Sequence, residues 1–244
     1  MTAQVDLRDG LIKSRLEDVG KVVLFASGKG GVGKSTLSAA SACILSAKGS
    51  VGVLDMDIHG PSIPLLFGVR DGRFRESRGG LLPAKIDGIA IMSVEFFARG
   101  RGMPVRGFGK VETMRDMMAA TDFGPVDTLI VDMPPGTGDE FITAIEMFRE
   151  KGSIIFVTRP TMNSWNVTRR AVEIAASMRS EVTGVVQNMG KLSKGIVKDC
   201  EALHVKSLGG IGRHDSIEDT PVNRLRGTAF MRELKGVLED AYIL

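Results

Sequence analysis

Short apolar runs alternate along the chain with longer stretches in which apolar residues recur at helical spacing. The runs are rich in β-branched residues and apolar on both faces, which is typical of strands in a parallel sheet covered by helices. They predict an α/β fold with a mainly parallel, twisted sheet of about seven strands and helices on both faces. The runs are KVVLFAS (21–27), SVGVLD (50–55), IDGIAIMSV (86–94), DTLIVD (127–132), GSIIFVT (152–158), EVTGVVQNM (181–189) and HVKSLGGIG (204–212).

The stretches between the runs predict the helices. One helix follows the first run and ends at Gly49, and the others are expected at 105–120, 139–151, 162–180 and 228–242. Because strands and helices alternate in this way, we expect βα units that build a single sheet.

Two polar stretches interrupt the pattern. Residues 6–20 have some helical character, and GVRDGRFRESRGGLL (68–82) is a polar loop that we expect to be a mobile segment rather than a domain boundary. No charge run or Pro/Ser-rich linker divides the remainder. We therefore expect a polar lead-in over 1–20 and a single domain over 21–244.

Composition narrows the class of protein. Hydrophobic residues make up 43% and charged residues 25% of the 244 positions, as in ordinary globular proteins. A net charge of +3 and an aromatic content of 5% give no reason to expect a nucleic-acid surface. Cys43 and Cys200 are too few for a disulfide framework, which indicates a reducing compartment. Without a signal-like start or a long apolar run, we expect a cytoplasmic protein with no membrane contact.

The strongest motif is GKGGVGKST, which follows the first apolar run and opens a helix. It matches G-x-x-x-x-G-K-[ST], the phosphate loop of P-loop NTPases, whose backbone N–H groups surround phosphate oxygens. Lys34 is expected at the β- and γ-phosphates of ATP, and the Ser35 hydroxyl is expected to bind Mg²⁺. The residues expected to contact ATP here are Gly28, Lys29, Gly30, Gly31, Val32, Gly33, Lys34, Ser35 and Thr36.

Acidic residues end two further strands, where ligands gather in open parallel sheets. Asp132 follows a hydrophobic strand and is expected to hold Mg²⁺ directly or through a water molecule. Asp57 lies just past another strand and is expected to orient or polarise the attacking water, with Asp55 in a supporting position. A single aspartate at a strand end is more often a helix cap or turn former, but three beside a phosphate loop favour a nucleotide site.

A second lysine inside the loop, Lys29, points to a particular superfamily. GKGGVGKST resembles the deviant phosphate loop of the MinD/ParA superfamily, in which the extra lysine reaches across a dimer interface to the other subunit's nucleotide. The resemblance implies that Lys29 acts in catalysis with Lys34 and Asp57. The alternative is a solvated loop lysine.

Flanking segments narrow the resemblance further. Two segments resemble the Mrp family of iron–sulfur cluster carrier ATPases: LDMDIHGPSIP (54–64) and IVDMPPGTGDE (130–140). Two more resemble it more loosely: MPVRG (103–107) and QNMGK (187–191). This implies a homodimer with two nucleotides near the interface, and apo iron–sulfur proteins or assembly factors as partners. We expect slow ATP hydrolysis, because the sequence offers no evident strong general base. By the same resemblance, the asparagine of QNMGK reads the adenine; the alternative is a turn formed by Asn-Met-Gly.

The sequence departs from that family at the cysteines. Many members carry a Cys-x-x-Cys pair shortly after Asn188, whereas this chain reads GKLSKGIVKDCEA (190–202), with Cys200 alone. If a cluster is bound, Cys200 is expected to be a solvent-reachable ligand that bridges two subunits, and Cys43 is expected to be a core residue. The missing pair leaves an alternative: a nucleotide-switched regulatory or partitioning ATPase of the MinD/ParA type that carries no cluster.

Overall fold

The structure is a computed structural model, and some segments lie outside what it describes. Both the segment 103–107 and the beginning of the helix expected at 105–120 fall outside it. The described residues are 6–58, 60–69, 74–96 and 109–244.

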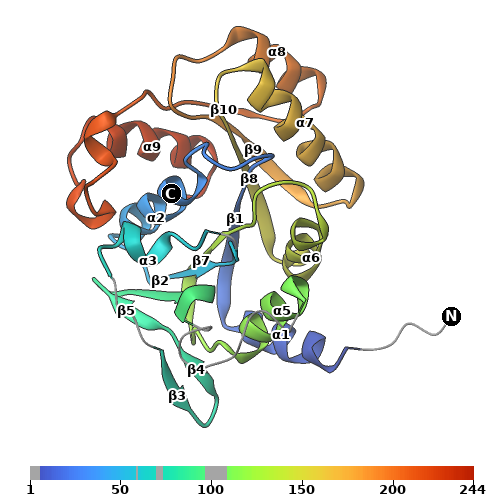
Figure 1. Ribbon diagram of the computed structural model, residues 1–244, viewed down its shortest axis with the longest axis vertical. Helices are drawn as coiled ribbons and strands as arrows, with labels where there is room; N and C mark the ends of the chain where they lie inside the picture. Colours follow the sequence, from blue (N-terminus) through green and yellow to red (C-terminus); the bar gives the residue numbers. More distant parts are fainter. Residues whose placement is uncertain (1–5, 59, 70–73, 97–108) are drawn as a thin grey trace, which may run out of the picture.

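Eight strands form one sheet in the order β10-β9-β8-β1-β7-β2-β6-β5 (Figure 1). Neighbouring strands are parallel except β5, which pairs antiparallel with β6. Each expected run overlaps one of these strands along most of the strand, which confirms the α/β prediction, and β5 is an addition at the edge. The strands are β1 (Val19–Ala26), β2 (Val51–Asp55), β5 (Ala84–Ile86), β6 (Ile89–Ser93), β7 (Val126–Asp132), β8 (Gly152–Thr158), β9 (Glu181–Gln187) and β10 (Ser207–Gly210).

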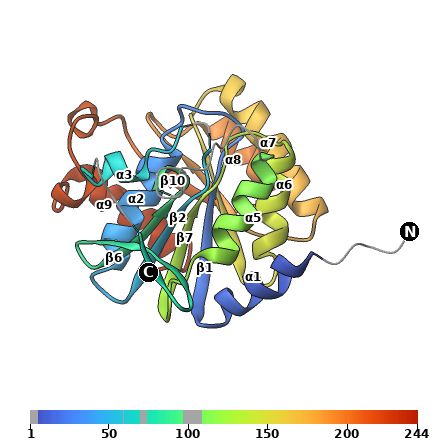
Figure 2. The same ribbon diagram turned by 60° about the horizontal axis from the view of Figure 1, so that its bottom comes forward.

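Helices cover both faces of the sheet and create two hydrophobic cores (Figure 2). Side chains alternate along β1, so that Val22 and Leu24 enter one core while Val23 and Phe25 enter the other. The first core is closed by α1 (Leu7–Glu17), α5 (Lys110–Ala120), α6 (Asp139–Phe148), α7 (Met162–Ser177) and α8 (Lys194–Ala202). The second is closed by α2 (Lys34–Leu45), α3 (Ile63–Leu66) and α9 (Ala229–Asp240), and short 3-10 turns span Asp215–Ile217 and Val222–Arg224.

The polar stretch 68–82 contains more structure than we expected. Its second half folds into a two-stranded hairpin, β3 (Arg75–Ser77) and β4 (Gly80–Leu82). The prediction of a single loop was wrong here because Leu81 is apolar and anchors the hairpin: its side chain is buried in the first core, and its backbone bridges to Thr121 after α5.

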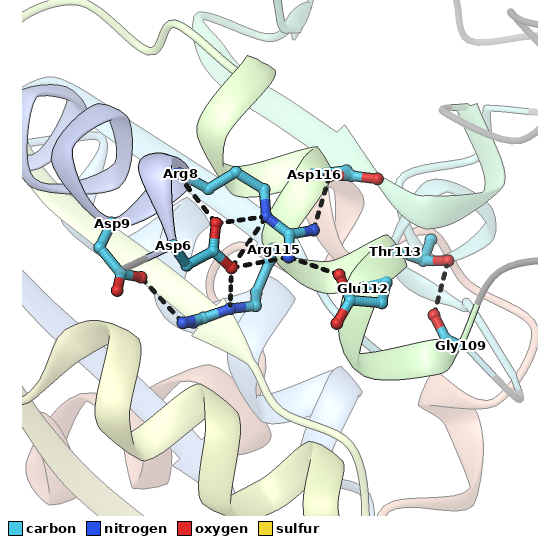
Figure 3. Close-up of polar contacts among 8 residues, drawn as sticks. All are labelled: Asp6, Arg8, Asp9, Gly109, Glu112, Thr113, Arg115 and Asp116. Carbon is cyan, nitrogen blue, oxygen red and sulfur yellow. Dashed lines mark hydrogen bonds and ion pairs between the residues drawn. The ribbon is translucent and has the colours of Figure 1, made fainter. Parts of the chain in front are cut away.

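Helix α1 packs against α5 through polar contacts (Figure 3). Asp6 caps the helix by accepting a hydrogen bond from the backbone N–H of Arg8. The Arg8 guanidinium pairs with Asp6 and with Glu112 and Asp116 of α5, and its hydrogen bonds lower the pKa of Asp6 to about 2. Because Ile12 and Leu16 are also buried, the N-terminal helix is part of the packed unit.

Trp165 joins α7 to α8. Its side chain is completely buried, and its indole Nε1 donates a hydrogen bond of 2.6 Å to Asp199 Oδ2. Such a bond satisfies the only polar atom of the indole, as buried tryptophan usually requires. The contact holds α8 against the first core.

Candidate functional site

The phosphate loop connects β1 to α2 and forms one wall of a pocket of about 210 Å³. Gly31 and Gly33 have φ values of 75° and 83°, which glycine adopts without strain. The pocket brings together the loop lysines and Asp57, which lie far apart in the sequence. Its lining residues are Ser27, Lys29, Gly30, Gly31, Val32, Gly33, Lys34, Ser35, Thr36, Asp57, Ser62 and Pro135.

Gly28, the first residue of the motif, has a different place. It does not line the pocket, and a Cβ added to it would lie 2.5 Å from the backbone nitrogen of Thr168 in α7. The glycine is needed because the loop and α7 approach each other closely. We therefore assign Gly28 a packing position behind the loop.

A buried cluster of charged and hydroxyl groups lies beneath the loop. Lys34 Nζ is 2.8 Å from Asp132 Oδ1, and the two side chains are 5% and 0% exposed. The hydroxyl of Ser35 donates to Asp132 Oδ2 at 2.6 Å, and the hydroxyl of Ser38 donates to Oδ1 at 2.7 Å. Sequence reasoning missed Ser38. Its position three residues after Ser35 on α2 places both hydroxyls on one side of the helix.

Asp55 lies beside Asp132 on the neighbouring strand but is held differently. The two residues are paired in the register of β2 and β7, and both are 0% exposed. Asp55 Oδ2 accepts hydrogen bonds from Ser93 Oγ at 3.0 Å and from the backbone nitrogen of Ile63 at 3.3 Å. Burial, followed by the charge of Asp132, raises the pKa of Asp55 to about 8. The site therefore contains one carboxylate paired with a lysine and one carboxyl group that favours its protonated form.

The donor set beneath the loop fits a magnesium ion. Mg²⁺ prefers oxygen ligands and retains several waters. Ser35 lines the pocket, and its hydroxyl oxygen lies 2.6 Å from Oδ2 of Asp132, a carboxylate buried behind it. When bound with ATP, Mg²⁺ would neutralise charge on the phosphate oxygens.

Asp57 and Lys29 lie at the mouth of the pocket, both partly exposed. The backbone of Asp57 donates to Asp55 Oδ1 at 3.2 Å, and its own Oδ1 accepts from the backbone nitrogen of Gly60 at 3.2 Å. The Ser27 hydroxyl donates to the backbone oxygen of Lys29 at 3.0 Å. These bonds fix the backbone at both residues and leave the Lys29 side chain at the pocket.

Asn188 follows β9 and touches the phosphate loop rather than lining the pocket. Its side-chain Nδ2 donates to the backbone oxygen of Val32 at 2.9 Å, and the residue is 4% exposed. Its expected contact with adenine stays a prediction. The contact with Val32 was not expected, because nothing in the sequence links positions so far apart.

Cys43 is a core residue, as expected, but Cys200 does not lie where a cluster ligand was expected. Cys200 is 1% exposed on α8 and packs into the first core with Ile196, four residues earlier. The prediction of a solvent-reachable thiol was wrong, because helical spacing turns both residues inward. Burial raises the pKa of Cys200 and of Cys43 to about 11, which disfavours the thiolate that binds metal. Within the described residues, no group of three or more His, Cys, Asp or Glu side chains is arranged to hold a metal ion.

Comparisons with known proteins agree with this site. Residues 18–222 match a ParA family described as NUBPL iron-transfer P-loop NTPases. An iron–sulfur cluster carrier protein of Rickettsia bellii is 36% identical over 186 residues, which are 75% of this chain and 58% of that protein. A cytosolic Fe-S cluster assembly factor NUBP2 homolog of Monosiga brevicollis is 39% identical over 206 residues, 81% of this chain and 72% of that protein. The chain thus spans little more than half of the Rickettsia protein.

Solved structures show the same fold. A nucleotide-binding protein from Archaeoglobus fulgidus, solved in complex with ADP, is 27% identical with a TM-score of 0.77, covering 92% of this chain and 96% of that chain. The cell division ATPase MinD of Pyrococcus furiosus is 16% identical with a TM-score of 0.67, and the match covers 91% of this chain and 98% of that chain. No helix in the described ranges is both long and apolar enough to cross a bilayer.

Proposed function

Since the chain belongs to the ParA-type family of iron-transfer P-loop NTPases, we propose that it binds ATP with Mg²⁺ and hydrolyses it slowly. One observation carries the proposal: Lys34, Ser35 and Asp132 converge beneath the glycines of a pocket-forming phosphate loop. The backbone N–H groups and Lys34 would bind the phosphates, and Ser35 and Asp132 would hold the metal.

Hydrolysis is assigned to the residues at the mouth of the pocket. Asp57 is held by one hydrogen bond from its backbone N–H and by another to its side-chain Oδ1, and it would orient the attacking water. Lys29 would stabilise charge on the transferring phosphoryl group of a second subunit. With no strong base among these groups, turnover is slow.

Three of the exposed apolar residues support a homodimer across the nucleotide edge. Leu65, Met162 and Leu192 are 59%, 53% and 47% exposed. They follow β2, β8 and β9, so all three lie beyond the carboxyl ends of parallel strands, the edge that also carries the phosphate loop. A second copy covering this edge would bury them and bring Lys29 towards the partner's nucleotide.

The names of the relatives suggest the cellular process. We propose that the chain works in the cytoplasm with apo iron–sulfur proteins or assembly factors, and that an iron–sulfur cluster is the cargo of that process. The burial of Cys43 and Cys200 favours a second candidate, a nucleotide-switched regulatory ATPase that carries no cluster of its own.

Calorimetric titration tests the nucleotide site. Wild type is expected to bind ATP with Mg²⁺, and Lys34→Ala to lose binding because the charge at the β- and γ-phosphates is gone. Lys48→Ala, which alters an exposed lysine just after α2, is the matched control. Unchanged ATP affinity in Lys34→Ala would contradict the assignment.

Anaerobic reconstitution with iron and sulfide separates the two candidates. Iron counted in the purified wild type and lost specifically in Cys200→Ala, but not in Cys43→Ala, would identify a carrier with Cys200 as ligand. Iron near zero in all three proteins would favour the cluster-free switch.

A further inference from the structure

Asn188 connects the end of β9 to the phosphate loop, 156 positions earlier in the chain. Its backbone nitrogen donates to the oxygen of Thr158, at the end of β8, at 2.7 Å. Two residues on, the backbone nitrogen of Gly190 donates to the oxygen of Ile211 at 3.2 Å. The asparagine is thus held by two neighbouring segments, which makes its side chain a rigid support.

The side chain meets the loop at its tightest turn. Asn188 Nδ2 donates to the Val32 oxygen at 2.9 Å, and Val32 precedes Gly33, whose φ is 83°. A Cβ added to Gly33 would lie 2.3 Å from Asn188 Nδ2, so the amide occupies the space that any other residue at 33 would need. Gly33 is also the N-cap of α2 and has no side chain with which to cap it.

The geometry of the peptide group gives this contact a consequence for anion binding. In a trans peptide, the C=O and the N–H point in opposite directions. A hydrogen bond that fixes the Val32 carbonyl therefore also fixes the direction of the Gly33 N–H. Val32 and Gly33 line the pocket, whereas Asn188 does not. The carbonyl is held on the Asn188 side, so the N–H is directed to the pocket side.

We infer that Asn188 is a positioning residue for the phosphate loop: its amide holds the Val32–Gly33 peptide in the orientation that binds phosphate, whatever base the ligand carries. The inference rests on the proposed nucleotide site and deepens it. A residue that only reads adenine would affect ligands with a base and leave a bare polyphosphate untouched. One hydrogen of the amide and its oxygen remain for a base, so the two roles are compatible.

Titration with two ligands distinguishes the positioning role from the base-reading role. One ligand is Mg-ATP, and the other is inorganic tripolyphosphate with Mg²⁺, because tripolyphosphate has no base. Asn188→Ala and Asn188→Leu both remove the donor, and the leucine keeps much of the volume packed against Gly33. Loss of one hydrogen bond predicts that both variants bind both ligands about 5- to 10-fold more weakly, with the ratio of the two affinities unchanged. Asn166→Ala, at an exposed asparagine of α7, is the control and is expected to match wild type.

Three outcomes have distinct meanings. Weaker ATP binding with unchanged tripolyphosphate binding in both variants would overturn the inference and leave Asn188 as a base reader. Unchanged binding of both ligands would overturn it as well. Failure of the wild type to bind either ligand would refute the proposed nucleotide site. Thermal melting without ligand checks that each variant is folded at the titration temperature, and the leucine variant provides the test if the alanine variant is not.

Discussion

Replacing Asp132 by asparagine removes a negative charge from beneath the phosphate loop with almost no change in shape. The asparagine oxygen can still accept the hydrogen bonds that Ser38 and Lys34 make to Oδ1, and its amide can donate to Ser35. What is lost is the charge that compensates Lys34, a lysine only 5% exposed. The matched variant is Asp55→Asn, at the paired position of the neighbouring strand.

The two substitutions are expected to differ strongly in their effect on the free energy of unfolding. Leaving one partner of a buried ion pair uncompensated costs about 3 kcal/mol or more of unfolding free energy. For a domain of this length, that lowers Tm by about 6–12 °C. Below about pH 4, where Asp55 is protonated in both the folded and the unfolded chain, Asp55→Asn replaces one neutral group by another and costs only about 1 kcal/mol, for imperfect hydrogen bonds to Ile63.

Stability as a function of pH gives a second signature. The pKa of Asp55 rises from 3.8 to about 8 on folding, so between these values the folded protein binds a proton that the unfolded chain does not. The resulting stabilisation is fully present below the unfolded pKa and is lost as pH rises through the folded pKa, at up to about 1.4 kcal/mol per pH unit. Asp55→Asn removes this contribution, so its stability relative to wild type improves from pH 5 to pH 8.

Urea unfolding followed by circular dichroism, in EDTA and without nucleotide, measures these differences. The expected order of stability at pH 7 is Asp55→Asn, then wild type, then Asp132→Asn well below both, because wild type must take up a proton on Asp55 when it folds and the asparagine needs none. If Asp55→Asn is as unstable as Asp132→Asn, then Lys34 is compensated by both carboxylates and the reasoning is refuted. The same conclusion follows if wild type and Asp55→Asn respond identically to pH.

The remaining predictions concern the pocket mouth and the α7–α8 contact. Asp57→Ala is expected to keep ATP affinity and to lose turnover by about 10²–10³-fold in a phosphate-release assay, because one positioned polar group is missing; normal turnover would remove Asp57 from the catalytic set. Lys29→Ala is expected to spare ATP binding more than kcat, and an equal loss of both would place Lys29 in ground-state binding. Trp165→Phe removes the 2.6 Å hydrogen bond to Asp199 and is expected to destabilise the fold by about 1.5–3 kcal/mol in urea; an unchanged midpoint would show that this bond contributes nothing.

The features that were predictable from the sequence are those encoded within short segments. The apolar run before Gly28 predicted β1, and the spacing of the glycines, Lys34 and Ser35 predicted the turn that follows it. The placement of Asp57 and Asp132 near this turn followed from a general property of parallel sheets, whose strand ends meet at one edge.

The features that could not be predicted depend on contacts between distant segments. Nothing local signals that Ser38 binds Asp132 or that Asn188 binds the Val32 carbonyl, because each pair is joined only by the packing of the sheet. The burial of Cys200 was hidden for a different reason. Its helical spacing with Ile196 was visible, but the helix itself was not expected, since the segment is rich in lysine and glycine.

The pairing of Lys34 with Asp132 means that the charge of this lysine is already compensated within the protein. If a nucleotide binds as proposed, its phosphates would compete with the Asp132 carboxylate for Lys34, and the displaced carboxylate would be left with an uncompensated negative charge. A divalent cation is the natural replacement, because it compensates Asp132 and the phosphates together. Nucleotide and cation are then thermodynamically linked, and each tightens the binding of the other by the same factor. The site would thus bind the nucleotide alone or the cation alone more weakly than it binds the two together.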